Sequence, residues 1–387
     1  MDKERSSERI IENGKQMTLQ LIESFDYFPA SNTNDAILSR LGMGKWFFYV
    51  NIAALGGMSI VTGTSTPFNS GKALRRATTV AQFDRLIQMA YPVPRVTEGY
   101  IGCHLFAESN YNANFGVSFM DSTSFEPHIS VTMDVLGRMN VWLGRPLTGT
   151  LLGTTSVGVF NKEAWFHLEV YTLIDDTVGE VEVRINTETV LDLVNVDTRN
   201  GQLSSFDLVG VIGTNDAGSN PIQYEYWRLD DFYYLDTAGT VNNTWKGNVR
   251  AKMQMAIADG ATNDWAIGGS APAATNWESV INTDTDDTKF VLGDPTELDL
   301  YDIDPNLNSP LVHALQVRGA HMMNDATQRA ITHQVRVDGV NYPFDEEHYL
   351  FQSWAYHRSI MELNPDTGVG WTGTEVNGVE IGQEVTL

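Results

Sequence analysis

Hydrophobic and polar residues alternate along most of this chain, in short runs that polar turns separate. Residues 165–170 are typical, because the polar His167 and Glu169 alternate with the apolar Phe166 and Leu168. Successive side chains of an extended strand point to opposite faces, so this period of two predicts a strand. We expect one of its faces to be buried and the other to face water.

Similar strand-like runs recur in both halves of the chain, separated by turns rich in Asn, Asp and Gly. In the first half they cover residues 45–50, 100–105, 115–120, 128–133, 139–143, 180–185, 208–212 and 227–234. In the second half they cover residues 249–256, 289–292, 314–317, 331–337 and 349–361. One amphipathic helix is expected over residues 80–89, where Phe83, Leu86 and Ile87 share a face.

Many short strands without intervening amphipathic helices predict an all-β sandwich or jelly roll rather than an α/β fold. The 387 residues exceed the usual size of one domain, and residues 236–247 are rich in Gly and Asn and poor in large apolar side chains. We therefore expect a polar N-terminal arm (1–16), a jelly-roll domain (17–237) and a second β-rich, sandwich-like assembly domain (238–387).

Charge and cysteine content exclude several classes of protein. The formal net charge of −24 repels phosphate, so no nucleic-acid partner is expected. The single cysteine, Cys103, excludes a disulfide scaffold, and its apolar surroundings predict a buried small side chain. Residues 1–15 have no apolar signal-peptide core, and residues 46–60 are too short and broken to span a membrane. We expect a protein that is made in a cytoplasm and stays soluble, without a membrane partner.

Three segments of the first half carry a resemblance to a known family. Residues 164–170 form a strand with Trp165 and Glu169, residues 181–186 form its hairpin partner, and residues 228–236 contain Asp230-Asp231 before an aromatic run. Their order resembles the laminin-G/concanavalin A-like jelly roll of tailed-bacteriophage virion proteins, over about residues 19–236. Segments 242–250, 259–265 and 364–377 resemble the continuation of the same proteins.

The resemblance implies a structural component of a tailed-phage particle, in the tail, a fibre or the baseplate, located in the virion after assembly in the host cytoplasm. Its partners would be other virion proteins and copies of itself in a symmetric assembly. A lectin-like, glycan-binding module that recognises the host surface stays open as an alternative, followed by a capsid decoration or head-fibre protein.

No catalytic residues are expected, so the sequence predicts a protein that is not an enzyme. The eight histidines lack the spacing of metal-ligand motifs, although His348 and His357 are close enough in sequence to form a pair. Nucleophile-elbow and phosphate-loop motifs are absent from the sequence. Glu180 and Glu182 share one strand face, but the start of a hairpin is usually exposed to solvent.

Contacts with a partner or a glycan are expected instead from aromatic residues in loop-like segments and from an acidic stretch. The candidate residues are Trp245, Trp265, Trp277, Trp371, Asp284, Asp286 and Asp287. Residues 282–287 resemble the start of a calcium-binding loop, but the sixth position is not glycine and the twelfth is Gly293 rather than glutamate. We expect no cofactor and no metal site, with calcium as the remaining alternative, and Asp230 and Asp231 could equally face an ion or cap a turn.

Overall fold

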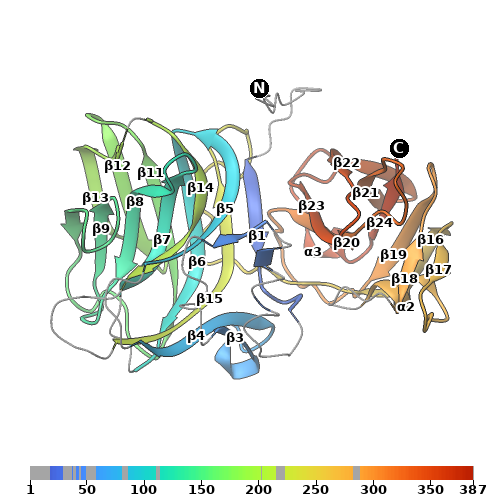
Figure 1. Ribbon diagram of the computed structural model, residues 1–387, viewed down its shortest axis with the longest axis horizontal. Helices are drawn as coiled ribbons and strands as arrows, with labels where there is room; N and C mark the ends of the chain where they lie inside the picture. The colour runs from blue at the N-terminus through green and yellow to red at the C-terminus, as the bar shows by residue number, and fades with distance from the viewer. Residues whose placement is uncertain are drawn as a thin grey trace.

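The computed structural model describes residues 18–28, 37, 41–42, 45–48, 58–80, 86–109, 114–201, 203–214, 223–281 and 288–386. Their regular structure is almost entirely antiparallel β-sheet, as the sequence predicted, and it forms two units side by side (Figure 1). We call residues 18–235 the N-terminal sandwich, residues 236–255 the linker and residues 256–386 the C-terminal unit. The helices within the described ranges are all too short or too polar to cross a bilayer.

The N-terminal sandwich is a jelly roll of two sheets packed face to face (Figure 1). Sheet A contains, in spatial order, β13 (Glu188–Val196), β12 (Gly179–Ile185), β11 (Trp165–Leu173), β6 (Glu98–Ala107), β15 (Gln223–Leu235), β4 (Lys72–Val80) and β3 (Met58–Thr62), with β1 (Leu19–Glu23) also paired to β15. Sheet B contains β10 (Thr150–Thr154), β9 (Met139–Leu143), β8 (Glu126–Met133), β7 (Asn114–Asp121), β14 (Phe206–Thr214), β5 (Leu86–Val96) and β2 (Phe47–Phe48). A 3-10 turn, η2 (Gly63–Ser65), follows β3.

The core of this sandwich is filled by the alternate residues that the sequence pattern assigned to one face. In β12, Val181, Val183 and Ile185 are buried while the residues between them are half exposed. The sheets meet through aromatic side chains, and Phe115 of β7 stacks on Trp227 of β15 with ring centroids 3.8 Å apart. Such contacts bury large apolar surfaces, which is the main stabilising contribution in a sandwich of this kind.

The C-terminal unit is a smaller sandwich. Its five-stranded sheet contains β16 (Ala256–Asn263), β19 (Leu298–Ile303), β24 (Glu380–Val385), β21 (Ala330–Val337) and β22 (Val340–Tyr349). A two-stranded sheet, β20 (Leu315–His321) with β23 (Ala355–Met361), packs on it through an apolar cluster around Trp371. Smaller elements are the pair β17 (Ala266–Gly268) and β18 (Phe290–Leu292), and the helices α2 (Asn276–Val280) and α3 (Gly373–Val376).

Side chains of the two-stranded sheet cover the free edge of β1, where the two units meet. The Gln316 amide accepts a hydrogen bond from Ile22 N (3.3 Å) and donates one to Ile22 O (3.0 Å), as a neighbouring strand would. The Glu362 carboxylate accepts from Thr18 N (2.9 Å) and Leu19 N (3.0 Å). These side chains satisfy backbone groups that an edge strand would otherwise leave unpaired.

A buried ion pair strengthens the same junction. Arg318 Nη1 lies 3.3 Å from Glu23 Oε2, and the Arg318 guanidinium also lies over the Tyr27 ring, 3.4 Å from its centroid. Tyr27 in turn contacts Tyr356 edge to face. The units are therefore held by paired charge and aromatic contacts as well as by the linker.

Two expected elements are wrong. The helix predicted over residues 80–89 is absent from the described part of that segment, where β4 ends at Val80 and β5 begins at Leu86. The strand predicted over residues 249–256 is an extended linker, and regular pairing begins only with β16. In the first case the pairing of β5 with the distant β14 overrides the short local pattern. Cys103 is fully buried, as predicted.

Candidate functional site

Three neighbouring strands of sheet A place polar side chains on the face of the sheet that points away from the sandwich core. His167 of β11 lies directly opposite His104 of β6, with ring centroids 4.9 Å apart. Asp230 of β15 lies opposite His104 on the other side. Glu169 lies two residues after His167, so it lies on the same face.

A β-bulge in β15 adds a second carboxylate to this cluster. The pairing of β15 with β6 is regular up to Asp230 and resumes only at Tyr233. Because a bulge sets two residues against one, Asp230 and Asp231 both lie on the outer face, and Phe232 returns to the core. Asp231 has a positive φ of 49°, which fits the bulge. Burial, and then the neighbouring Asp231 carboxylate, raises the pKa of Asp230, so Asp230 is protonated near neutral pH.

The linker covers this polar face, which the sequence had led us to expect in water. Glu169 Oε1 accepts hydrogen bonds from the backbone N–H groups of Lys246 (2.8 Å) and Gly247 (2.9 Å), and from Tyr233 Oη (2.6 Å). Glu169 is therefore only 1% exposed. The prediction of a solvent-exposed face was wrong, because alternation identifies two faces but not the segment that covers either of them.

His104 links the cluster to the linker through both ring nitrogens. Nε2 lies 2.9 Å from Asn248 Oδ1, which can only accept, so this nitrogen carries a proton. Nδ1 lies 3.1 Å from Asp231 Oδ2, while Asp231 Oδ1 accepts from Ala251 N (2.8 Å). His104 thus lies between the Asp231 carboxylate and Asn248 of the linker.

The ring of His167 lies next to that of His104 and adds two unpaired ring nitrogens to the cluster. It is 1% exposed, and within the described residues neither of its ring nitrogens has a hydrogen-bond partner. Glu169 Oε2 lies 4.0 Å from His167 Nδ1. Burial, and then the charge of His104, lowers the pKa of His167 to about 3, so the ring is neutral. Sequence analysis missed His104 as a site residue, although a histidine inside an apolar strand was a signal.

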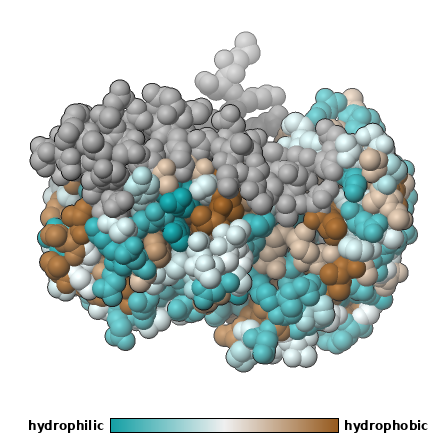
Figure 2. Space-filling model, turned by 90° about the horizontal axis from the view of Figure 1, so that it is seen from below, coloured by the Kyte–Doolittle hydropathy of each residue, from teal (hydrophilic) through white to brown (hydrophobic). Residues whose placement is uncertain are grey.

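A cavity of about 1380 Å³ begins at this cluster and continues between β1, the linker and the C-terminal unit. Asp231 and Asn248 lie in its wall at the end formed by the N-terminal sandwich, and His321 and His333 lie in its wall inside the C-terminal unit. Figure 2 shows hydrophobic residues gathered where the two units meet. The volume exceeds that of a typical small-molecule pocket, so the cavity has room for an extended ligand.

Aromatic side chains from both units line this cavity: Tyr27, Phe68, Trp265, Phe290, Trp354 and Tyr356. Its charged lining residues balance, with six basic and six acidic side chains. This balance contrasts with the net charge of −24 for the whole chain. The cavity is thus a nearly neutral, aromatic surface inside a strongly acidic protein.

The four tryptophans predicted to make contacts from loops lie in different surroundings. Trp265 lies in the bend between β16 and β17, the loop-like setting that was expected, but it is only 8% exposed in the cavity wall. Trp371 pairs with Val312 in an isolated bridge and is fully buried in the core of the C-terminal unit. Trp245 is half-buried against Tyr100, and Trp277 is half-buried in α2. Their apolar or sequence-distant neighbours cover these side chains in a way that local sequence does not reveal. Contact roles for the tryptophans stay predictions.

The acidic candidates cannot be placed. Asp284, Asp286 and Asp287 lie outside the described residues, and the calcium-loop resemblance lies there too. Within the described residues, His, Cys, Asp and Glu side chains form no group of three or more suited to a metal ion. His348 and His357, considered from the sequence as a pair, lie on β22 and β23, which follow each other in the chain but belong to different sheets, and their ring centroids are 5.1 Å apart.

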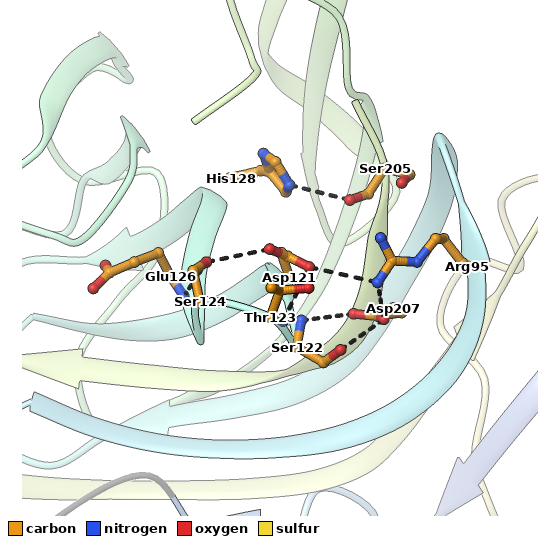
Figure 3. Close-up of polar contacts among 9 residues, drawn as sticks. All are labelled: Arg95, Asp121, Ser122, Thr123, Ser124, Glu126, His128, Ser205 and Asp207. Carbon is orange, nitrogen blue, oxygen red and sulfur yellow. Dashed lines mark hydrogen bonds and ion pairs between the residues drawn. The ribbon is translucent and has the colours of Figure 1, made fainter. Parts of the chain in front are cut away.

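A second polar network lies at the rim of sheet B, where the turn between β7 and β8 meets β5 and β14 (Figure 3). Asp207 accepts hydrogen bonds from Ser122 N (2.7 Å) and Ser122 Oγ (2.8 Å) and pairs with Arg95 (2.5 Å). His128 accepts from Asn200 N at Nδ1 and donates from Nε2 to a backbone carbonyl. Because these groups use their hydrogen-bonding capacity on one another, the network fixes the turn and offers less to a ligand than the cavity does.

No protein-family model matches the chain, and no curated protein sequence is similar to it. Solved structures with a similar sandwich include a sialidase (TM-score 0.39, 11% identity). The match covers 58% of this chain but only 19% of the sialidase, so this chain spans a small part of that protein's length. They also include the alginate lyase Aly36B (TM-score 0.37, 14% identity, 57% of this chain and 97% of that one). A third is the carbohydrate-binding module CBM66 from Bacillus subtilis (TM-score 0.31, 9% identity, 50% of this chain and 96% of that one). At these values the similarity describes a jelly-roll sandwich and does not identify a family.

The sequence-based prediction that the chain is not an enzyme is contradicted by this comparison. Structures of a sialidase and of an alginate lyase share this type of sandwich. The prediction rested on the absence of familiar catalytic motifs. Such motifs belong to particular families, and sandwich enzymes assemble their catalytic residues from strands distant in sequence, so their absence does not exclude catalysis.

Proposed function

We propose that the chain recognises a carbohydrate in the cavity between its two units. The observation that carries this proposal is the cavity itself, which is lined by both aromatic side chains and hydrogen-bonding groups. Aromatic rings pack against the C–H faces of sugars, while carboxylates and amides bind hydroxyl groups in fixed directions. Asp231 and Asn248, both joined to His104, supply such groups at one end.

The charge of the cavity favours a neutral ligand. Six basic and six acidic residues line it, so it offers no concentrated charge of either sign. The acidic surface of the whole chain repels polyanions over distances of about 8 Å at physiological salt. We therefore propose a neutral oligosaccharide of several units, since a single sugar would fill little of the available volume.

A binding titration tests the proposal. Tetrasaccharides of glucose and of N-acetylglucosamine are added to the full chain, with a galacturonate tetramer as the anionic comparison, and binding is followed by calorimetry. Saturable binding of a neutral sugar and weaker binding of the anionic one is the expected result. Chromatography of the same samples for shortened products reports whether binding is followed by cleavage.

Two substitutions localise the binding. Trp354→Ala and Phe68→Ala each remove an aromatic wall of the cavity and should weaken binding about tenfold, equivalent to roughly 1.4 kcal/mol. Trp142→Ala removes a half-buried tryptophan of β9, outside the cavity, and is the matched control. Equal effects of all three substitutions, or no binding of any neutral sugar, would show that the proposal is wrong.

The resemblance to tailed-phage proteins supports a narrower proposal, that this recognition occurs on a virion. Its support is the order of the sequence segments around Glu169, Asp231 and Trp371. Antibodies raised against the chain should label intact phage particles in electron micrographs. Absence of label from mature particles would remove this proposal and leave carbohydrate recognition unaffected.

A further inference from the structure

Four of the eight histidines lie together in the core of the C-terminal unit. They come from four strands: His321 from β20, His333 from β21, His348 from β22 and His357 from β23. The ring centroids form a closed circuit with separations of 5.4, 5.1, 5.2 and 5.7 Å. All four side chains are at most 7% exposed. We call this group the histidine cluster.

Hydrogen bonds within the cluster limit how many of its rings can be protonated at once. Ser359 Oγ lies 2.8 Å from His333 Nδ1 and 2.8 Å from His348 Nε2, so the hydroxyl donates to one ring and accepts from the other. His321 Nδ1 lies 3.3 Å from His357 Nδ1, which is a hydrogen bond only when one of the two nitrogens is unprotonated. His321 Nε2 contacts the Gln383 carbonyl oxygen of β24. His321 and His357 therefore cannot both be doubly protonated without losing the bond between their Nδ1 atoms.

The surroundings of the cluster also disfavour positive charge. Burial is the largest influence on the pKa of each ring and lowers it, to about 4 for His321 and His357 and to about 3 for His348. Neighbouring histidines contribute to the lowered pKa of His321, His333 and His348, and Lys45 of the N-terminal sandwich contributes to that of His348 and His357. The hydrogen bond from Gln383 partly opposes the effect for His321.

The cluster lies between the two sheets of the unit, and these sheets are anchored differently. His321 and His357 belong to the two-stranded sheet, which Arg318 and neighbouring side chains fasten to the N-terminal sandwich. His333 and His348 belong to the five-stranded sheet. Repulsion between charged histidines would therefore separate the five-stranded sheet from a partner that stays in place.

We infer that the C-terminal unit is an acid-sensitive switch, in which protonation of the histidine cluster opens the sandwich between its two-stranded and five-stranded sheets. Because His321 and His333 line the large cavity, the same opening widens it. The inference rests on the position of the cluster and does not depend on what the cavity binds.

The pH range follows from linkage. An exposed histidine has a pKa of about 6.5, and these rings have lower values in the closed state, so the closed state binds fewer protons. Its stability is complete above about pH 6.5 and falls as the pH drops toward 4. For a ring whose pKa changes from 6.5 to 4, the ratio of open to closed molecules rises about 20-fold between pH 7 and pH 5. Two such rings acting together give roughly 500-fold.

Side-chain footprinting by hydroxyl radicals in the full chain measures the opening. Trp371 lies in the apolar cluster that joins the two sheets and is fully buried, while Trp227 is equally buried in the N-terminal sandwich. Oxidation of Trp371 should rise between pH 7 and pH 5 and fall again on return to pH 7. Oxidation of Trp227 should stay constant over the same range.

Substitutions separate the cluster from general acid unfolding. His333→Gln and His348→Gln each remove one titrating ring, so the midpoint of Trp371 oxidation should move to lower pH. His128→Gln is the control, because burial also lowers the pKa of His128, which lies in the N-terminal sandwich. If the cluster variants fail to fold, the pH dependence of Trp371 oxidation in the unmodified chain still tests the inference. Protection of Trp371 down to pH 4.5, or an equal shift in the His128 variant, would overturn the inference.

Discussion

Glu169 offers a sharp test of how the linker is held against sheet A. Its Oε1 atom accepts three hydrogen bonds, two of them from backbone N–H groups of the linker at Lys246 and Gly247. Glu169→Ala removes the acceptor and leaves these donors in a site that water reaches poorly. Each unsatisfied buried donor costs about 1–3 kcal/mol, so with the lost Tyr233 bond the substitution should destabilise the protein by about 3–6 kcal/mol.

A conservative substitution of Glu169 separates the contribution of its charge from that of its oxygen acceptor. Glu169→Gln keeps an oxygen acceptor but loses the charge that strengthens the three bonds, so it should cost roughly 1–3 kcal/mol. Urea unfolding followed by tryptophan fluorescence measures both values. Hydrogen exchange at Lys246 and Gly247 shows whether the linker has come free, because both amides should lose protection in the alanine variant.

Glu182→Ala is the matched control for this experiment. Glu182 lies on β12 of the same sheet, but it is partly exposed, and its carboxylate bonds to the side chains of Arg184 and Thr189. Surface pairs of this kind contribute about 0–1 kcal/mol. If Glu169→Ala destabilises the protein no more than Glu182→Ala does, the linker is not anchored by this carboxylate and the reasoning is refuted.

Three further outcomes are expected. Arg318→Met leaves the Glu23 carboxylate buried without its cation and should lower the free energy of unfolding in urea by about 3–5 kcal/mol. A decrease below 1 kcal/mol would show that the ion pair does not stabilise the junction. Trp371→Ala should lower the thermal stability of the C-terminal unit by about 3–5 kcal/mol in calorimetry, and the half-buried Trp277→Ala by clearly less. Burial raises the pKa of the Cys103 thiol, so it should react with a chromogenic disulfide reagent only after unfolding; rapid reaction in the native protein would contradict its burial.

Sequence periodicity located strands well where one face meets the core. The expected strand over residues 139–143 coincides with β9, and the hairpin expected after Glu169 is the pair β11–β12. These segments obey a local rule, since alternate residues enter the core whatever lies elsewhere in the chain. The all-β prediction followed from many such segments.

The candidate site depended on contacts that no local pattern contains. His104, Glu169 and Asp231 come together because β11, β6 and β15 are neighbours in sheet A, and because one bulge turns a second carboxylate outward. The linker reaches them from beyond the end of the first unit. Trp371 was expected in a loop, and it does follow one, but its ring fills the core between two sheets. Contacts between distant segments therefore determine which residues form the site, that the linker covers it, and that Trp371 is buried.

The side-chain contacts along the free edge of β1 have a practical consequence for experiments on separate parts of the chain. Two side chains of the C-terminal unit, Gln316 and Glu362, stand in for a missing neighbour along that strand. A fragment cut at the linker would keep β1 but lose this cover, exposing a row of unpaired backbone groups to other molecules of the fragment. The N-terminal sandwich expressed alone should therefore self-associate, and the two units should be handled as one indivisible piece.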